Sequence, residues 1–337
     1  MTKILLIYTG GTIGMIKNPI SGELESFNFK HIHDHVPELN RLNVQIESIS
    51  FNEPIDSSEM NLEHWRMMSA LVEEHYHLFD GFVILHGSDT MAFSASALSF
   101  MLQGLKKPIV FTGSQLPIGT IRTDGKENLI TAIEIAGMKD SQGEAILQEV
   151  AVYFEYSLYR GNRSSKISAN QFEAFQSPNY PELAKAGVQI EWQKDRLFRT
   201  ELPEFQVFTS FKNNVALIRL FPGMNFEFYR SIFADQQVEA IVLETYGSGN
   251  APSDVLFQEL VTSFIERGGI VLNITQCGSG AVQQGAYKTS SFFERMGVIS
   301  GRNLTSEAAI TKLMYLLGNT SENIREKLQE SLVGEMD

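Results

Sequence analysis

Cysteine is almost absent from this sequence: Cys277 is the single thiol among 337 residues. One cysteine excludes an internal disulfide and any zinc site built from several cysteines. A chain without disulfides fits a reducing compartment. The cysteine count therefore favours a cytoplasmic location.

Long apolar runs are also missing from the beginning of the chain, where residues 4–7 form a run of only four before Tyr8 and Thr9. The apolar core of a signal peptide needs about seven to fifteen residues, and a membrane-spanning helix needs about twenty. Neither is present. We expect the N-terminus to be part of the fold and the protein to be cytoplasmic.

Positive charge is scarce, since 27 lysine and arginine residues stand against 40 aspartate and glutamate residues, a net charge of −13. Such a protein is poorly suited to bind phosphate backbones or anionic lipid. Nucleic acid and membrane are therefore not expected as partners. The hydrophobic share of 43% and the charged share of 20% are typical of a soluble globular protein.

The apolar pattern of the first half alternates between two kinds of segment. Short runs rich in valine and isoleucine are typical of buried parallel strands. They occupy residues 3–9, 44–50, 81–85, 108–112 and 150–156. Apolar positions or small residues at helical spacing predict helices over 62–79, 90–105 and 126–138. This alternation predicts a doubly wound sheet.

The second half repeats the pattern on a smaller scale. Strands are predicted over 215–220, 240–245 and 269–275, and helices over 253–267, 306–317 and 322–332. Periodicity weakens over about 154–199, which indicates a long loop and an interdomain connection. The predicted fold class is α/β, a larger N-terminal doubly wound parallel-sheet domain plus a smaller C-terminal α/β domain. The boundaries are 1–190, a linker over 191–212, and 213–337.

Polar segments follow four of the predicted strands, at 9–14, 56–59, 86–90 and 112–115. Ligands of open α/β sheets bind beyond the carboxyl ends of the strands. The four segments contain hydroxyls, carboxylates and glycines, with no metal-ligand set. The predicted site therefore lies at these strand ends.

The glycines of segment 9–14 suggest a nucleotide-phosphate loop as an alternative. Their spacing does not supply the dinucleotide pattern G-x-G-x-x-G, and the P-loop pattern fails around Gly125 and Lys126 because glutamate follows. A threonine hydroxyl such as that of Thr12 attacks a carbonyl carbon if a base removes its proton and backbone N–H groups stabilise the oxyanion. Taken alone, this loop is weak evidence for catalysis, because a strand followed by a glycine turn is common in proteins.

Six short motifs extend from the first strand to the second domain. They are Thr-Gly-Gly-Thr-Ile-Gly-Met (9–15), Asp-Ser-Ser-Glu-Met (56–60), His-Gly-Ser-Asp-Thr-Met (86–91), Gly-Asn-Arg-Ser-Ser-Lys (161–166), Tyr-Gly-Ser-Gly-Asn-Ala-Pro (246–252) and Thr-Gln-Cys (275–277). In this order they resemble the bacterial-type asparaginases, specifically the cytoplasmic type I branch. The resemblance covers essentially the whole chain.

The resemblance implies hydrolysis of L-asparagine to L-aspartate and ammonia, with Thr12 forming an acyl-enzyme. Ser88, Asp89 and Lys166 would make a hydroxyl, carboxylate and ammonium cluster that moves protons. No cofactor and no metal is implied. The family active site lies between subunits, so a homodimer or homotetramer is expected.

The resemblance also implies how the substrate is held. Ser57 would bind its α-carboxylate and Asp89 its α-ammonium through charge-assisted hydrogen bonds. Asn250 would reach a neighbouring site. The predicted substrate-binding residues are Gly11, Ser57, Ser58, Glu59, Gly87, Ser88, Asp89, Ser114 and Asn250.

Several of these side chains also have a structural interpretation. Asp89 precedes the helix predicted over 90–105 and would serve as its N-cap. Ser57 and Ser58 would cap the helix predicted over 62–79 in the same way. Lys166 would be a solvated surface lysine.

Histidines offer a metal site as a further alternative. His31, His33 and His35 alternate in a loop-like stretch, where such histidines are more often incidental than metal ligands.

The sequence departs from the family pattern at two places. Ser88 stands where the family usually has threonine, so the hydroxyl is kept without the methyl that restricts its rotamer. Many members have a tyrosine after the first strand that orients the nucleophile, but residues 15–30 contain only Phe27 and Phe29 as aromatics. A phenol would have to come from elsewhere, such as Tyr287.

Some type I members are cooperative through a second asparagine site. Thr275, Gln276 and Cys277 are the candidate regulatory residues here. A basic residue that precedes the Tyr-Gly motif in those members is replaced by Glu244-Thr245, so cooperativity is not expected.

Two other functions remain as alternatives. One is an amidotransferase subunit of the same superfamily that supplies ammonia for charging tRNA. Those chains carry an extra N-terminal domain, whereas the first strand here is predicted near residue 3. The other is a non-catalytic module that binds an amino acid or a nucleotide.

Overall fold

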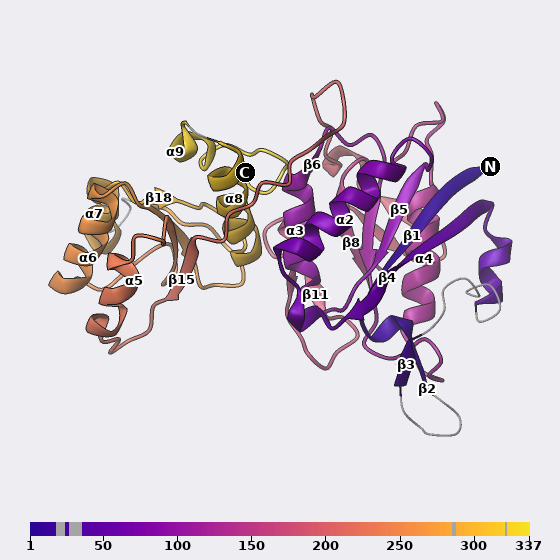
Figure 1. Cartoon of the computed structure of the whole chain (residues 1–337), viewed down its shortest axis with the longest axis horizontal. Helices are drawn as coiled ribbons and strands as arrows, with labels where there is room; N and C mark the ends of the chain where they lie inside the picture. Colours follow the sequence, from indigo (N-terminus) through magenta and orange to yellow (C-terminus); the bar gives the residue numbers. More distant parts are fainter. Residues whose placement is uncertain (18–23, 27–35, 285–287, 321) are drawn as a thin grey trace. The chain divides into compact units, whose positions relative to one another are not determined.

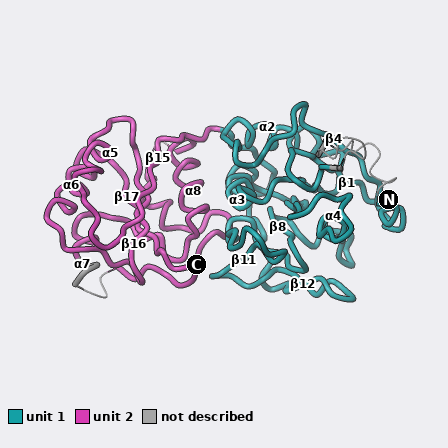
Figure 2. Tube along the Cα trace, turned by 90° about the horizontal axis from the view of Figure 1, so that it is seen from below, with its two compact units in different colours: residues 1–209 teal, residues 210–337 magenta. Residues whose placement is uncertain are grey.

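The computed structural model describes residues 1–17, 24–26, 36–284, 288–320 and 322–337 (Figure 1). The chain forms two compact units, Met1–Thr209 (unit 1) and Ser210–Asp337 (unit 2), which Figure 2 colours separately. Each unit has its own sheet and its own hydrophobic core. The predicted fold class, a larger N-terminal α/β domain and a smaller C-terminal one, is confirmed.

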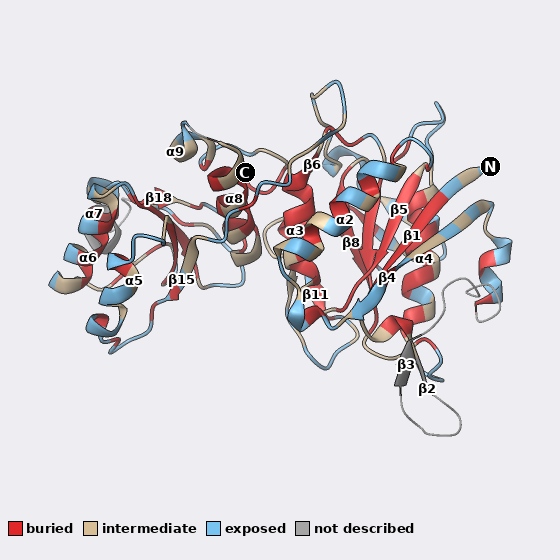
Figure 3. Cartoon of the chain, viewed as in Figure 1, coloured by how far each residue is buried: buried red, intermediate tan, exposed pale blue. Residues whose placement is uncertain are grey.

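Unit 1 is built on an eight-stranded sheet of order β13-β12-β9-β8-β7-β5-β1-β4. Its strands are β1 (Thr2–Gly10), β4 (Val44–Ile55), β5 (Gly81–Leu85), β7 (Ile109–Thr112), β8 (Val150–Phe154), β9 (Ser157–Arg160), β12 (Ala184–Ala186) and β13 (Ile190–Trp192). The strands from β4 to β8 in this order are parallel, and the other three pair antiparallel. Figure 3 shows that buried residues concentrate on the central strands.

The helices of unit 1 match the predicted helical segments. They are α2 (Leu62–His75), α3 (Met91–Met101) and α4 (Gly125–Gly137). Leu129 and Ala132 of α4 belong to the same core cluster as Leu6 of β1 and Val83 of β5, so α4 covers one face of the sheet. In α3 the residues are mostly small and almost all buried, which permits close packing on its neighbours.

Short elements fill the remainder of unit 1. They are η1 (Thr12–Gly14), β2 (Met15–Lys17), β3 (Leu24–Ser26), η3 (Pro37–Arg41), η4 (Ser57–Glu59), β6 (Leu102–Gln103), η5 (Gly161–Arg163), β10 (Ser165–Lys166), β11 (Phe175–Gln176), η6 (Lys194–Arg196) and β14 (Gln206–Val207).

The stretch 154–199 differs from the expected long loop, because β9, β12 and β13 extend the sheet there. These strands have three or four residues each, too few for an alternating pattern to show in the sequence. Residues 191–212, the predicted linker, contain η6 and β14, and β14 pairs with β6. The predicted domain boundaries stay a prediction.

Unit 2 contains a four-stranded parallel sheet of order β15-β16-β17-β18. The strands are β15 (Val215–Arg219), β16 (Ala240–Thr245), β17 (Ile270–Thr275) and β18 (Ile299–Ser300). The helices are η7 (Phe226–Tyr229), α5 (Arg230–Ala234), α6 (Val255–Glu266), α7 (Lys288–Met296), α8 (Ser306–Asn319) and α9 (Ile324–Lys327). The helix predicted over 322–332 is thus much shorter than expected. Nowhere in the described ranges is a helix long and apolar enough to cross a membrane.

Candidate active site

The four polar segments predicted from the sequence meet at one edge of the sheet of unit 1. Tyr8 near the end of β1 pairs with Leu85 at the end of β5, and Leu85 pairs with Thr112 at the end of β7. On the other side of β1, Gly10 pairs with Ile55 at the end of β4. Because these strands are parallel neighbours, their carboxyl ends bring the four loops together.

A glycine contact joins the loop of Thr12 to the loop of Ser88. A Cβ atom on Gly11 would lie 2.5 Å from the backbone nitrogen of Gly87, and Gly11 has φ of 84°, where glycine is favoured. Thr12 and Ser88 directly follow these two glycines. A Cβ atom on Gly87 would in turn lie 2.5 Å from the Ser57 hydroxyl oxygen. The loops of Thr12 and Ser88 therefore pack backbone against backbone, and the Ser57 side chain packs on Gly87.

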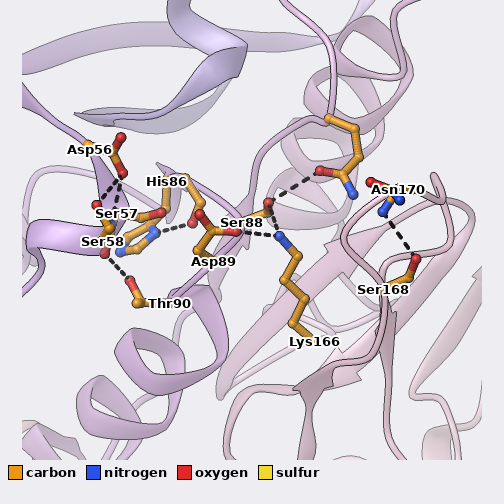
Figure 4. A network of polar contacts seen from close by, with 12 residues as sticks. Asp56, Ser57, Ser58, His86, Ser88, Asp89, Thr90, Lys166, Ser168 and Asn170 are labelled. Carbon is orange, nitrogen blue, oxygen red and sulfur yellow. Dashed lines mark hydrogen bonds and ion pairs between the residues drawn. The ribbon is translucent and has the colours of Figure 1, made fainter.

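Lys166 connects two of the predicted catalytic side chains (Figure 4). Its Nζ donates to the Ser88 Oγ at 2.8 Å and to the Asp89 Oδ1 at 2.6 Å. The Lys166 side chain is 16% exposed and that of Asp89 is 66% exposed. The structure thus brings Ser88, Asp89 and Lys166 into one group, called the relay cluster below, that is open to solvent on its carboxylate side.

The structural interpretations of these residues do not hold. Asn61 is the N-cap of α2 and accepts from two backbone N–H groups of its first turn, so neither serine of η4 caps that helix. The N-cap of α3 is Thr90, whose hydroxyl donates to the Ser57 carbonyl oxygen at 2.7 Å. Asp89 and Lys166 bind each other instead of acting as a cap and a solvated surface lysine.

The remaining predicted binding residues of unit 1 differ in exposure. Ser57 is buried at 4%, while Ser58 and Glu59 are exposed. Ser58 donates both its backbone N–H and its hydroxyl to Asp56, which lowers the pKa of that carboxyl below its usual value. Ser114 is buried, and its hydroxyl donates to the Leu116 carbonyl oxygen at 2.6 Å. In these contacts Ser58 and Ser114 hold their own loops.

The matches of known families to this sequence agree with the geometry. The model "Asparaginase, N-terminal" matches residues 3–198, and the model "Glutaminase/Asparaginase C-terminal domain" matches residues 214–330. The chain belongs to the asparaginase family. The predicted family and the prediction of an asparaginase enzyme are therefore confirmed.

Individual relatives in the family are similar over the full chain. L-asparaginase 1 of Escherichia coli K12 is 39% identical, over 99% of this chain and 98% of its own. The crystal structure of L-asparaginase I from Vibrio cholerae has a TM-score of 0.90 at 37% identity and covers 100% of this chain and 99% of its own. The thermostable L-asparaginase from Thermococcus kodakarensis has a TM-score of 0.90 at 32% identity, with the same coverage. The similarity to L-asparaginase 1 agrees with the predicted type I branch.

Two residues that the sequence analysis did not assign lie beside the relay cluster of this asparaginase-family chain. Gln115 accepts from the Ser88 hydroxyl at 3.4 Å and donates to the Gln171 carbonyl oxygen at 2.9 Å. Asp124 is buried and accepts from the backbone N–H of Gln115 at 2.8 Å. Gln115 ends a segment that the sequence had marked as polar, but nothing in the sequence indicates which of its atoms reach the site.

His86 begins the loop that carries Ser88 and is fully buried. Its Nδ1 lies 2.7 Å from the Gly87 carbonyl oxygen, so Nδ1 carries the hydrogen. Burial lowers the pKa of His86 to about 4, which keeps the ring neutral. The ring also packs edge-on against Phe111. This fixed tautomer holds the peptide that precedes Ser88.

Unit 2 contains the remaining predicted site residues. Asn250 closes a tight loop in which its backbone exchanges hydrogen bonds with Tyr246. Thr275 donates to the Gly247 carbonyl oxygen at 2.5 Å, and Gln276 donates to two backbone carbonyls. The exposed Cys277 gives its backbone N–H to Thr275. The Thr275 and Gln276 side chains therefore bind backbone in this unit.

Several residues of the sequence-based predictions lie outside the described residues. They concern Phe27, Phe29, His31, His33, His35 and Tyr287. Within the described part of the chain, no group of three or more histidine, cysteine, aspartate or glutamate side chains is arranged to hold a metal ion.

Proposed function

We propose that this protein hydrolyses L-asparagine to L-aspartate and ammonia through an ester on Thr12. The observation that supports it best is the relay cluster, whose Ser88 and Asp89 lie on a loop that is joined to the Thr12 loop through Gly11 and Gly87. This arrangement pairs a nucleophile with neighbouring groups able to move protons.

The reaction has two steps. In the first, the Thr12 Oγ forms a bond to the side-chain carbonyl carbon of asparagine, and its proton passes to the amide nitrogen, which leaves as ammonia. In the second, water attacks the resulting ester, the bond to Thr12 breaks, and the Thr12 oxygen regains a proton. Backbone N–H groups of the glycine loops are suited to stabilise the negatively charged oxygen of each tetrahedral intermediate.

The relay cluster supplies the proton transfers. Lys166 donates to the Ser88 oxygen and therefore stabilises the negative charge that develops on it when Ser88 gives up its proton. Asp89 binds Lys166 through Oδ1, and its exposed side chain is suited to bind the α-ammonium of the substrate. Ser57 binds the α-carboxylate in this proposal.

The other predicted binding residues complete the proposal. The loops around the bound substrate contribute the remaining binding residues, which are Gly11, Gly87, Ser114, Ser58 and Glu59. Asn250 serves a neighbouring site in a homodimer or homotetramer, and light scattering of purified protein tests that assembly. The cytoplasm is the proposed location, with no cofactor required.

An ammonia-release assay with Thr12→Ala tests the proposed function. Loss of the nucleophile should lower kcat by several orders of magnitude. Thr120→Ala, at an exposed threonine of the same unit, is the matched control and should keep wild-type turnover. Rapid quench followed by mass spectrometry should find an aspartyl ester on the peptide that contains Thr12.

Two outcomes would contradict the proposal. Wild-type protein that releases no ammonia from asparagine, glutamine or β-aspartyl peptides would favour a binding module. Near-normal turnover by Thr12→Ala would remove Thr12 from the role of nucleophile.

A further inference from the structure

The orientation of the Gln115 side-chain amide is fixed by its two partners. Its Nε2 donates to the carbonyl oxygen of Gln171 at 2.9 Å, and a carbonyl only accepts. The amide oxygen Oε1 therefore faces Ser88, whose Oγ lies 3.4 Å away. Since Oε1 has no hydrogen, the Ser88 hydroxyl is the donor in this bond.

The direction of the Ser88 hydroxyl follows from this. Its hydrogen points to Gln115, and one lone pair accepts from the Lys166 ammonium at 2.8 Å. A hydroxyl oxygen has two lone pairs, so one stays free to accept another hydrogen bond. The Ser88 hydroxyl therefore has a fixed direction, with its hydrogen toward Gln115 and its oxygen beside the Lys166 ammonium.

We propose that Gln115 is a positioning residue that fixes the direction of the Ser88 hydroxyl and links it to the hairpin that carries Lys166. This inference rests on the proposed function, in which Ser88 takes part in proton transfer. Gln115 acts through Ser88 and does not itself bind the substrate.

Both ends of Gln115 are anchored, which suits this role. Its backbone N–H donates to the buried carboxylate of Asp124 at 2.8 Å. Gln171 lies in the connection between β10 and β11, and β10 contains Lys166. Gln115 therefore fixes the distance between the loop after β7 and the β10–β11 hairpin.

Serine makes this constraint useful. A serine side chain has no β-methyl group, so its χ1 angle is less restricted than that of threonine. The bonds to Gln115 and Lys166 approach Ser88 from two directions and select one rotamer. Threonine at this position would depend less on Gln115.

The test compares kcat, KM and the pH profile of ammonia release in Gln115→Met and wild type. Methionine has a similar length but cannot form either hydrogen bond. We expect kcat to fall about 10- to 100-fold, as small misplacements of reacting groups do, with a smaller change in KM. The acidic or basic limb of the kcat–pH profile should also shift, because the hydrogen-bond environment of the relay cluster changes.

A matched control is Gln148→Met. Gln148 is half-buried like Gln115 and donates its Nε2 to a backbone carbonyl, that of Ala145 at 3.2 Å. It directly precedes Glu149 and Val150, where β8 begins, at the opposite end of that strand from the site. This variant should keep wild-type kcat, KM and pH profile.

A double-mutant cycle with Ser88→Thr sharpens the test. Gln115→Met should cost at least fivefold less in kcat when residue 88 is threonine than when it is serine. Equal costs in both backgrounds would overturn the rotamer argument. Thermal melting checks that each variant is folded, and Gln115→Leu, which also lacks both side-chain hydrogen bonds, replaces Gln115→Met if the latter does not fold.

The two proposals fail in different ways. Wild-type kcat and pH profile in folded Gln115→Met, together with an inactive Thr12→Ala, would overturn the role of Gln115 alone. Activity that survives in Thr12→Ala would overturn the proposed function instead.

Discussion

The two units each hold a lysine–carboxylate pair, and the pairs differ in what surrounds them. In unit 1, Lys166 and Asp89 are 2.6 Å apart, and the carboxylate side chain is 66% exposed. In unit 2, Lys312 of α8 and Glu335 are 2.7 Å apart, and both side chains are 0% exposed. The Lys166–Asp89 pair is open to solvent (the open pair), and the Lys312–Glu335 pair is fully buried (the sealed pair).

The sealed pair has its hydrogen-bonding groups occupied. Lys312 also donates to the carbonyl oxygens of Leu328 and Glu330, and the Glu335 carboxylate accepts from two backbone N–H groups of the segment after α9. Burial lowers the pKa of Lys312 from its ordinary value, while the charge of Glu335 opposes that shift. Such a pair fixes the last residues of the chain on α8, whereas the open pair leaves a carboxylate available for a ligand.

Lys166→Met gives the largest expected effect. Removing a proton-transfer partner should lower kcat by about 100- to 10,000-fold. The melting temperature should stay close to wild type, because the partner Asp89 is exposed and remains hydrated. Lys185→Met, at an exposed lysine of the same unit, is the control. An ammonia-release assay measures kcat, and calorimetry measures the melting temperature. A large loss of stability with intact kcat would show that the Lys166–Asp89 pair serves stability and not activity.

Lys312→Met should act on stability instead. It leaves Glu335 buried and unpaired, so the free energy of unfolding should fall by about 3 to 5 kcal/mol. The kcat of the folded fraction should not change. Urea unfolding gives the first value, and the double variant Lys312→Met with Glu335→Gln should recover part of the loss because no lone charge remains. An unchanged free energy of unfolding in Lys312→Met would show that the Lys312–Glu335 pair does not stabilise the fold.

His86 adds a pH dependence to unit 1. Its pKa is about 4 in the folded protein and near 6.5 when unfolded, so the unfolded state binds the proton more readily between these values. The contribution of the neutral His86 ring to the free energy of unfolding is therefore complete above pH 6.5. About 3 kcal/mol of it is lost as the pH falls toward 4. Urea unfolding at several pH values should show this decline in wild type and a smaller one in His86→Asn. Parallel curves would contradict the prediction.

Thr275→Val should have the smallest effect. It removes the hydroxyl that bonds Gly247 and Cys277, which should cost about 1 to 2 kcal/mol of unfolding free energy. If these residues are structural, the dependence of ammonia release on asparagine concentration should be hyperbolic in both wild type and variant. A sigmoidal wild-type curve that the substitution removes would instead assign Thr275 a regulatory role.

The sequence predicted the larger features of this molecule and few of its contacts. The parallel strands β1, β5 and β7 were predictable because short apolar runs buried on both faces have a clear pattern. The meeting of their polar ends followed from the parallel arrangement alone. In contrast, β12 and β13 are too short to show a period, and α9 spans only four residues.

The site shows the same limit. The resemblance to the asparaginases implied proton transfer by Ser88, Asp89 and Lys166, but only the structure places the lysine on both partners. Gln115 could not be assigned, because a glutamine after a strand has no distinctive pattern and its partner Gln171 is distant in sequence. The roles of these residues in catalysis stay predictions.

The contact between Gly11 and Gly87 limits how this protein can vary. Neither position has room for a single added carbon, because the atoms in the way belong to backbone or to Ser57. Random mutagenesis of the two loops should therefore return glycine at both positions among active clones. A shift of either loop will therefore displace the other.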